Sequence, residues 1–201
     1  MNKIRNSLEM PIARASVFDK SSVKVYNCRK YFYNRGDGVK VVSKQNNSHM
    51  CLICGMDNTA GVHAQFYNME DGSVGGLFTF RSEHQSYPGR VHGGMLATMV
   101  DELAGRVLWT DHPDKIGVTM DINVKYRKPV PYDVPLKGRG VYLQKLSRAY
   151  SAKCYIMNMD GEVLAEGEAK YLIMPAEKIT DASLGEELDI YVPDNVTEID
   201  F

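Results

Sequence analysis

The chain has 201 residues, of which 44% are apolar, and this is enough for one domain with a buried core plus extensions. Its formal net charge of −1 argues against non-specific nucleic-acid binding as the main activity. No stretch near the start is apolar enough for a signal peptide, and no run approaches the roughly 20 residues that span a membrane. We therefore expect a cytoplasmic protein without membrane contact.

Charge is unevenly distributed between the two ends of the chain. Residues 1–47 form a basic extension, in which alternating runs at 23–26 and 39–42 flank a Gly-Asp-Gly turn and predict a hairpin added to the main sheet. Its basic, tyrosine-rich character leaves contact with a nucleotide or nucleic acid as an alternative. Residues 176–201 form an acidic tail that either lies on the basic extension or is solvated, and we expect the second. Residues 48–175 are then the main domain.

A Cys-x-x-Cys pair, Cys51 and Cys54, opens this domain, with His49 and His63 nearby. A structural zinc site normally takes four ligands in clear pairs, and no second Cys-x-x-Cys or His-x-x-x-His follows. A redox disulfide does not fit a cytosolic chain well. We interpret the two thiols as small apolar groups in a buried turn, and we expect neither a metal nor a cofactor.

The rest of the main domain has a pattern of strands, one long helix and further strands. Alternation and turn residues predict strands at 61–67, 73–80, 117–126, 137–145, 150–158 and 162–174, with turns at Asp71-Gly72 and Asp160-Gly161. Gly75 and Gly76 suggest a bend or bulge in the second strand. A helix is predicted over 92–109, and Pro113 prevents its continuation. Strands clustered around a single helix predict an α+β fold and not a βαβ repeat.

The predicted helix has two distinct faces. Its apolar stripe, suited to packing on a sheet, consists of Leu96, Met99, Val100, Leu103 and Val107. Asp101 lies about 140° round from Leu96, on a face of small residues, so its carboxylate is expected to point away from the sheet.

The helix begins with Gly93 and Gly94, which leave the unpaired N–H groups of the first turn uncovered, where they would stabilise a carbonyl oxygen that gains negative charge. Gly93 and Asp101 are separated by roughly 12 Å along the helix, so a single carbonyl can hardly touch both. A second, antiparallel copy of the helix would bring the Asp101 of one chain near the Gly93 of the other, which favours a twofold homodimer.

These residues resemble the PaaI-like thioesterases of the hotdog-fold superfamily, over roughly residues 51–174. The resemblance is carried by Pro88-Gly89-Arg90-Val91-His92-Gly93-Gly94, by Asp101, by Thr119 and by Tyr126-Arg127-Lys128-Pro129-Val130-Pro131. It implies an α+β hotdog fold with a long central helix wrapped by an antiparallel β-sheet. It also implies a homodimer, which can pair into a homotetramer, and hydrolysis of an acyl-CoA thioester without a cofactor.

The same resemblance implies a role for each motif residue. The Gly93 N–H would bind the developing oxyanion, and Asp101 would be the general base or the nucleophile. His92 would position these groups, and Thr119 would be a partner of Asp101 or of its water.

Three further residues are expected to contact the substrate. In the resemblance, Gln85 stands where relatives place an amide beside the thioester carbonyl, and Gly94 is part of the exposed helix start. Arg148, in a turn between strands, is the first cation to test for contact with a CoA phosphate, although a solvated turn arginine is the favoured interpretation. Each of these assignments has a plain structural alternative, and Asp101 itself would otherwise be an ordinary solvated helix acid beside Glu102.

Two other functions stay open from the sequence. A hotdog module can bind acyl-CoA without hydrolysing it, as a sensor or carrier. A hotdog hydratase or dehydratase would pair a histidine with an acid, and the position of the acid in this chain fits that function less well. Release of free CoA distinguishes hydrolysis from binding.

Overall fold

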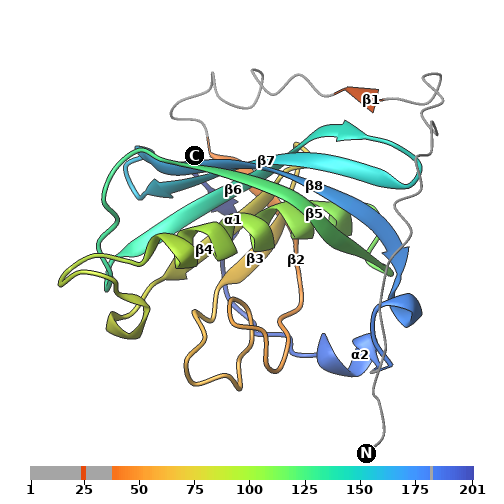
Figure 1. Ribbon diagram of the computed structural model, residues 1–201, viewed down its shortest axis with the longest axis horizontal. Helices are drawn as coiled ribbons and strands as arrows, with labels where there is room; N and C mark the ends of the chain where they lie inside the picture. Colours follow the sequence, from red (N-terminus) through yellow and green to blue (C-terminus); the bar gives the residue numbers. More distant parts are fainter. Residues whose placement is uncertain (1–23, 26–37, 182) are drawn as a thin grey trace, which may run out of the picture.

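The computed structural model describes residues 24–25, 38–181 and 183–201 (Figure 1). Its elements are, in chain order, β1 (Lys24–Val25), β2 (Val39–Lys44), β3 (Gln65–Met69), β4 (Val74–Thr79), α1 (Gly93–Arg106), β5 (Lys115–Tyr126), β6 (Pro135–Lys145), β7 (Ala149–Asn158), β8 (Val163–Pro175), α2 (Leu184–Glu187) and β9 (Glu198–Ile199). Short 3₁₀ turns occupy Ser82–His84, Val107–Thr110 and Ala176–Lys178. Neither α-helix is both long and apolar enough to cross a membrane.

The described strands form one antiparallel sheet in the order β5-β8-β7-β6-β4-β3-β2-β9, with β1 beside β6. The four predicted strands after the helix are confirmed, and Gly72 and Gly161 adopt the positive φ that their turns need. The strand predicted from residue 61 begins only at Gln65. The reason is that the amides of Val62 and Ala64 bond to the carbonyls of Leu52 and Ile53, in the preceding loop, and not to a neighbouring strand.

Helix α1 lies against one face of this sheet (Figure 1) and buries its predicted apolar stripe. Leu103 is fully buried against β4 and β6 at positions where these strands carry glycine. A Cβ at Gly76 or Gly138 would come within about 3 Å of the Leu103 methyl groups, so the two glycines make room for this side chain. The expected bulge in the strand at 73–80 is therefore wrong. β4 pairs with β6 without a register shift, and Gly76 serves the close approach of the helix.

The hairpin expected in the N-terminal extension is also wrong for the strands that the structure describes. β1 pairs with the last residues of β6, whereas β2 pairs with β3 on one side and β9 on the other. Both edges of β2 are thus occupied, while β6 continues beyond the end of β4 and offers β1 a free edge. The intervening turn falls within 26–37, outside the described residues.

The acidic tail is not simply solvated, contrary to our expectation. Strand β9 pairs with β2, and Ile199 is buried with Tyr67 and Met69 in a second, smaller core. Asp194 forms an ion pair with Lys44 and accepts a hydrogen bond of 2.7 Å from the hydroxyl of Tyr67. The tail therefore packs on the segment around β2 and β3, because it supplies both apolar side chains and a carboxylate to that surface.

Docking of the tail should weaken in acid through Asp194. Partial burial would raise the pKa of this carboxyl, but the hydrogen bonds from Lys44 and Tyr67 outweigh it and lower the pKa below the ordinary 3.8. A depressed carboxyl pKa stabilises the folded form above about pH 3.8, and this contribution is lost as the pH falls through the lower folded value. Hydrogen exchange of the Val41 amide, which donates to Thr197, should report the loosening. In Asp194→Asn this acid-induced step should disappear; if it persists, Asp194 is not its source.

Candidate active site

Asp101 is half-buried and lines a cavity of about 160 Å³ between α1 and the β5–β8 edge of the sheet. Its Oδ1 accepts hydrogen bonds from Thr119 Oγ1 at 2.9 Å and from Tyr171 OH at 2.7 Å. Within the described part of the chain, the hydrogen bonds of this carboxylate all fall on Oδ1. Oδ2 is consequently without a hydrogen-bond partner among the described residues.

The helix geometry alone predicted that the Asp101 carboxylate points away from the sheet. In the structure it points only partly away. It lies at the margin of the helix–sheet interface because the side chains of Thr119 on β5 and Tyr171 on β8 extend up to α1. The Tyr171 hydroxyl is also 2.8 Å from the Asp101 carbonyl, and its ring stacks on Tyr150 at 4.8 Å. Burial, together with the charge of Asp101, raises the pKa of Tyr171, so this phenol stays protonated and donates.

A β-bulge falls at this point of β5. The pairing of β5 with β8 shifts between Thr119 and Asp121, so that Met120 is an extra residue beside the Asp101 contact. A bulge re-aims neighbouring side chains. Thr119 reaches the helix although it belongs to the exposed central part of its strand.

The start of α1 presents a single free backbone donor. His92 is the N-cap, and its Nδ1 accepts the N–H of Gly94 at 2.8 Å. The N–H of Gly93 has no partner among the described residues, whereas its carbonyl accepts the hydroxyl of Tyr126 at 3.0 Å. Because the cap by His92 Nδ1 occupies the Gly94 N–H, Gly93 is the N–H that remains for a ligand at the positive end of the helix.

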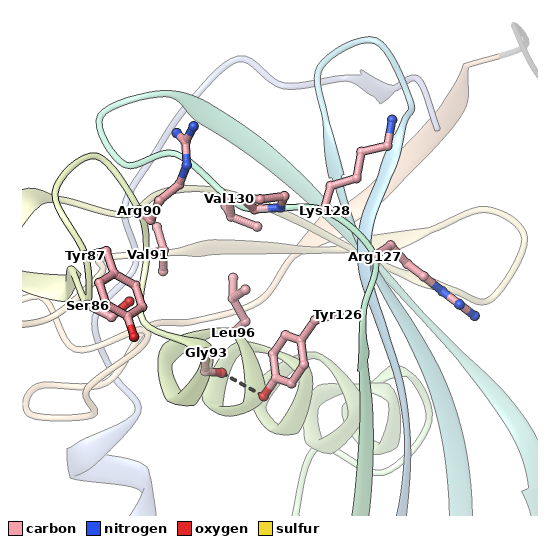
Figure 2. A pocket seen from close by; sticks show the side chains of 11 residues that line it. Ser86, Tyr87, Arg90, Val91, Gly93, Leu96, Tyr126, Arg127, Lys128 and Val130 are labelled. Atoms are coloured by element: carbon pink, nitrogen blue, oxygen red, sulfur yellow. Dashed lines mark hydrogen bonds between the residues drawn. The ribbon is translucent and has the colours of Figure 1, made fainter.

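Gly93 lines a second cavity, of about 470 Å³, which Figure 2 shows from close by. Apolar groups such as Leu96 and the ring of Tyr126 surround Gly93, and the cationic ends of Arg90, Arg127 and Lys128 point outward around them. Arg127 is paired with Glu166 and Lys128 with Glu162. The guanidinium of Arg90 donates a hydrogen bond only to the carbonyl of Gly89 among the described residues, which leaves its other N–H groups available for an anion.

The other predicted substrate-binding residues do not line the cavity at Gly93. Gln85 is exposed in the loop before α1, and Gly94 is exposed with its N–H occupied. Neither residue lines the cavity around Gly93. Arg148 is exposed in the β6–β7 turn, at the end of the sheet that carries Thr119 and Tyr171.

No site role was assigned to Tyr171, Tyr126 or Arg90 from the sequence. Tyr171 lies in a strand that is distant in sequence from Asp101, and only the pairing of β5 with β8 brings the two together. Tyr126 and Arg90 belong to the motif that carries the family resemblance. Their hydroxyl and cationic groups, together with that motif, were the signal that could have indicated a binding role.

A separate group of side chains is able to hold a metal. The ligand atoms of Cys51, Cys54 and Glu102 all lie within 4.8 Å of one another. The hydrogen bond from the Cys51 thiol and the charge of Arg106 outweigh burial and lower the pKa of Cys54 to about 7. The same hydrogen bond, with burial and the charge of Glu102, raises the pKa of Cys51.

An antiparallel sheet with one long helix on one face fits the hotdog class of α+β proteins. Residues 88–147 match the thioesterase superfamily family model. This stretch, which contains the start of α1 and Asp101, is therefore similar to the thioesterase superfamily.

Individual proteins are also similar to this chain. Acyl-coenzyme A thioesterase THEM4 of Mus musculus is 30% identical over 118 residues, which are 58% of this chain and 50% of the mouse protein. A crystal structure of a thioesterase superfamily protein superposes with a TM-score of 0.57 at 27% identity, covering 62% of this chain and 63% of the other.

A more distant structure shares the fold. It is a hypothetical thioesterase with coenzyme A from Streptococcus pneumoniae, with a TM-score of 0.51 at 22% identity, over 56% of this chain and 89% of that one. The chain spans about half the length of the curated relatives it matches.

Proposed function

We propose that this protein hydrolyses an acyl-CoA thioester to a free acid and CoA, with Asp101 as general base or nucleophile. The observation that carries the proposal is the setting of Asp101, whose Oδ1 is fixed by Thr119 and Tyr171. Two donors on one oxygen hold the carboxylate in place beside the cavity, and Oδ2 keeps its lone pairs free of protein donors among the described residues. A carboxylate held in this way is suited to accept a proton from water or to attack a carbonyl.

The chemistry needs little more than a base and an oxyanion donor. Sulfur donates little resonance to the thioester carbonyl, so water activated by Asp101 can attack the carbon directly. The carbonyl oxygen then becomes an oxyanion, which the free Gly93 N–H at the helix start stabilises. Collapse of the tetrahedral intermediate expels the thiolate of CoA, and the proton taken up by Asp101 is available to it.

The two groups belong to different chains in our proposal. Asp101 and Gly93 line separate cavities of one chain, about 12 Å apart along α1. β5 is the last strand at its end of the described sheet, and its residues 119–123 are exposed. Antiparallel pairing of two β5 edges would place two α1 helices side by side and antiparallel, which brings the Asp101 of one protomer toward the Gly93 of its partner.

Three observations support CoA as the thiol. The cavity at Gly93 combines apolar lining with outward cations, which suits an acyl thioester that carries phosphates. The mouse relative is named an acyl-CoA thioesterase, and the Streptococcus pneumoniae structure contains coenzyme A. Arg90 is the cation we assign to a phosphate of the substrate, and Arg148 is a second candidate from the other end of the sheet.

Release of CoA from a panel of short, medium, long and aromatic acyl-CoAs tests the proposal. Product CoA is best separated by chromatography, because a thiol-reactive dye would also label the partly exposed Cys51. We expect turnover with at least one chain length, and the panel then identifies the acyl class. Saturable binding of the same acyl-CoAs without any CoA release would contradict hydrolysis and favour a binding module.

A further inference from the structure

A compact cluster of two thiols and one carboxylate joins the loop before β3 to helix α1. Cys51 Sγ lies 3.6 Å from Oε2 of Glu102, the residue that follows Asp101 on the helix. With Cys54, the ligand atoms of these three residues all fall within 4.8 Å. The sequence could not reveal this third group, because Glu102 is distant along the chain and adjacent only in the fold.

The loop holds the two sulfurs in a fixed arrangement. The amide of Ile53 donates to Cys51 Sγ at 3.3 Å, and the amide of Gly55 donates to the Cys51 carbonyl at 2.8 Å. A Cβ at Gly55 would stand 2.4 Å from that carbonyl, so the tight turn requires glycine there. Asn47 Nδ2 stabilises the turn by donating hydrogen bonds to the carbonyls of Cys54 and Ala64. An amide aimed at a sulfur is the arrangement that stabilises a thiolate.

Arg106 orients the carboxylate of the cluster. Its Nε donates to Glu102 Oε1 at 2.7 Å, which turns Oε2 toward Cys51. The guanidinium packs on the rings of both Phe66 and Trp109, and Arg106 is only 2% exposed. Its Nη2 is buried without a hydrogen-bond partner among the described residues, on a side chain close enough to Cys54 to interact with its charge. An unpartnered buried N–H is costly, and a metal-bound thiolate beside it would be an acceptor.

We propose that Cys51, Cys54 and Glu102 bind a zinc ion. Two thiolates and one carboxylate carry three negative charges, which a divalent cation and the Arg106 guanidinium balance to neutrality in a buried place. Sulfur and carboxylate oxygen are accepted zinc ligands, and a solvent molecule completes a tetrahedral set at the partly exposed side of Cys51. Binding releases the two thiol protons to solvent, because only thiolates ligate the metal.

The ion would fasten the loop of residues 48–64 to α1 beside the catalytic carboxylate. Glu102 is both a ligand of the ion and a lining residue of the Asp101 cavity. Zinc is thus expected to act on stability, by holding the loop and the helix together, and it takes no part in the hydrolysis itself.

Metal content and cobalt spectroscopy on the full chain test this proposal. The protein is prepared without a histidine tag from zinc-supplemented medium, and its metals are measured by mass spectrometry. We expect about one zinc ion per chain. Replacement of zinc by Co²⁺ should produce a thiolate-to-metal charge-transfer band and the intense visible bands of tetrahedral cobalt, and removal of the metal by a chelator should lower the unfolding temperature.

Matched variants assign the ligands. The double variant Cys51→Ser with Cys54→Ser should lose the metal, whereas Cys154→Ala, which removes a buried thiol outside the cluster, should keep it. Glu102→Gln should weaken zinc binding by at least roughly tenfold.

Two outcomes would overturn the proposal. One is wild-type protein, well folded and fully reduced, that neither contains zinc nor takes up cobalt. The other is a Cys51–Cys54 disulfide in protein purified without reductant, together with no metal uptake after reduction. Both results use the wild-type chain, so a variant that fails to fold does not obscure them. CoA release is measured separately, and its absence would leave this test unaffected.

Discussion

Replacing Asp101 with alanine should lower kcat for acyl-CoA hydrolysis by roughly 10²–10⁴-fold, the usual contribution of a positioned base. Asp101→Asn should lose nearly as much, because the amide keeps the hydrogen bonds from Thr119 and Tyr171 but cannot accept the proton or attack as a carboxylate does. KM should change little, since the carboxylate acts mainly on the transition state. Steady-state CoA release measures both constants.

Graded variants separate chemistry from folding in this experiment. Tyr171→Phe retains the ring stack on Tyr150 and removes only the hydroxyl that orients the carboxylate, so a smaller loss of about tenfold is expected. Asp114→Asn, an exposed acid beyond the end of α1, serves as the control and should turn over at the wild-type rate. Full activity in a folded Asp101→Ala protein would remove Asp101 from the mechanism.

Gly93→Pro should lower kcat by roughly 10²–10³-fold, the effect of deleting one oxyanion donor. Proline removes the N–H and nothing else that the helix uses, because the first helical position has no intrahelical partner for its amide. The preceding residue is already compatible, since His92 has φ −64° and ψ 135°, the extended conformation that proline requires before it. The fold should therefore survive.

Gly93→Ala is the matched control for that substitution. Its Cβ would meet the Tyr126 ring at 3.5 Å, an ordinary contact, while the N–H remains in place. We expect Gly93→Ala to retain activity within about tenfold of wild type. Equal losses in the alanine and proline variants would mean that bulk at this position, and not the missing N–H, is responsible.

Periodicity and turn chemistry predicted most of the fold, because those elements are specified locally. The apolar stripe of the helix and the alternation in β5 to β8 are visible in short windows of sequence, and so are the glycines at positions 72 and 161. The errors occurred where partners are distant along the chain. Gly76 looked like a bulge because Leu103, which it accommodates, lies on another element, and the tail looked solvated because its apolar contacts are on β3.

The candidate site was predictable only in part for the same reason. Motif spacing identified Gly93 and Asp101, and the resemblance added Thr119, which the structure places in hydrogen-bond contact with Asp101. Tyr171 required the pairing of β5 with β8, and the joining of Cys51 to Glu102 required the packing of a loop on a helix. No window of sequence contains either relation.

The position of β9 has a consequence for the order in which the molecule assembles. Its partner β2 lies almost at the opposite end of the described chain, so this pairing closes one of the longest loops in the structure. Contacts of such separation carry the largest closure entropy and form late. The other strands and α1 can form first, with Asp101 already in contact with β5 and β8. The tail then packs onto a sheet that is otherwise formed. In the native protein the same contacts should be among the first to open, uncovering Tyr67 and Met69 while the helix and its acid stay in place.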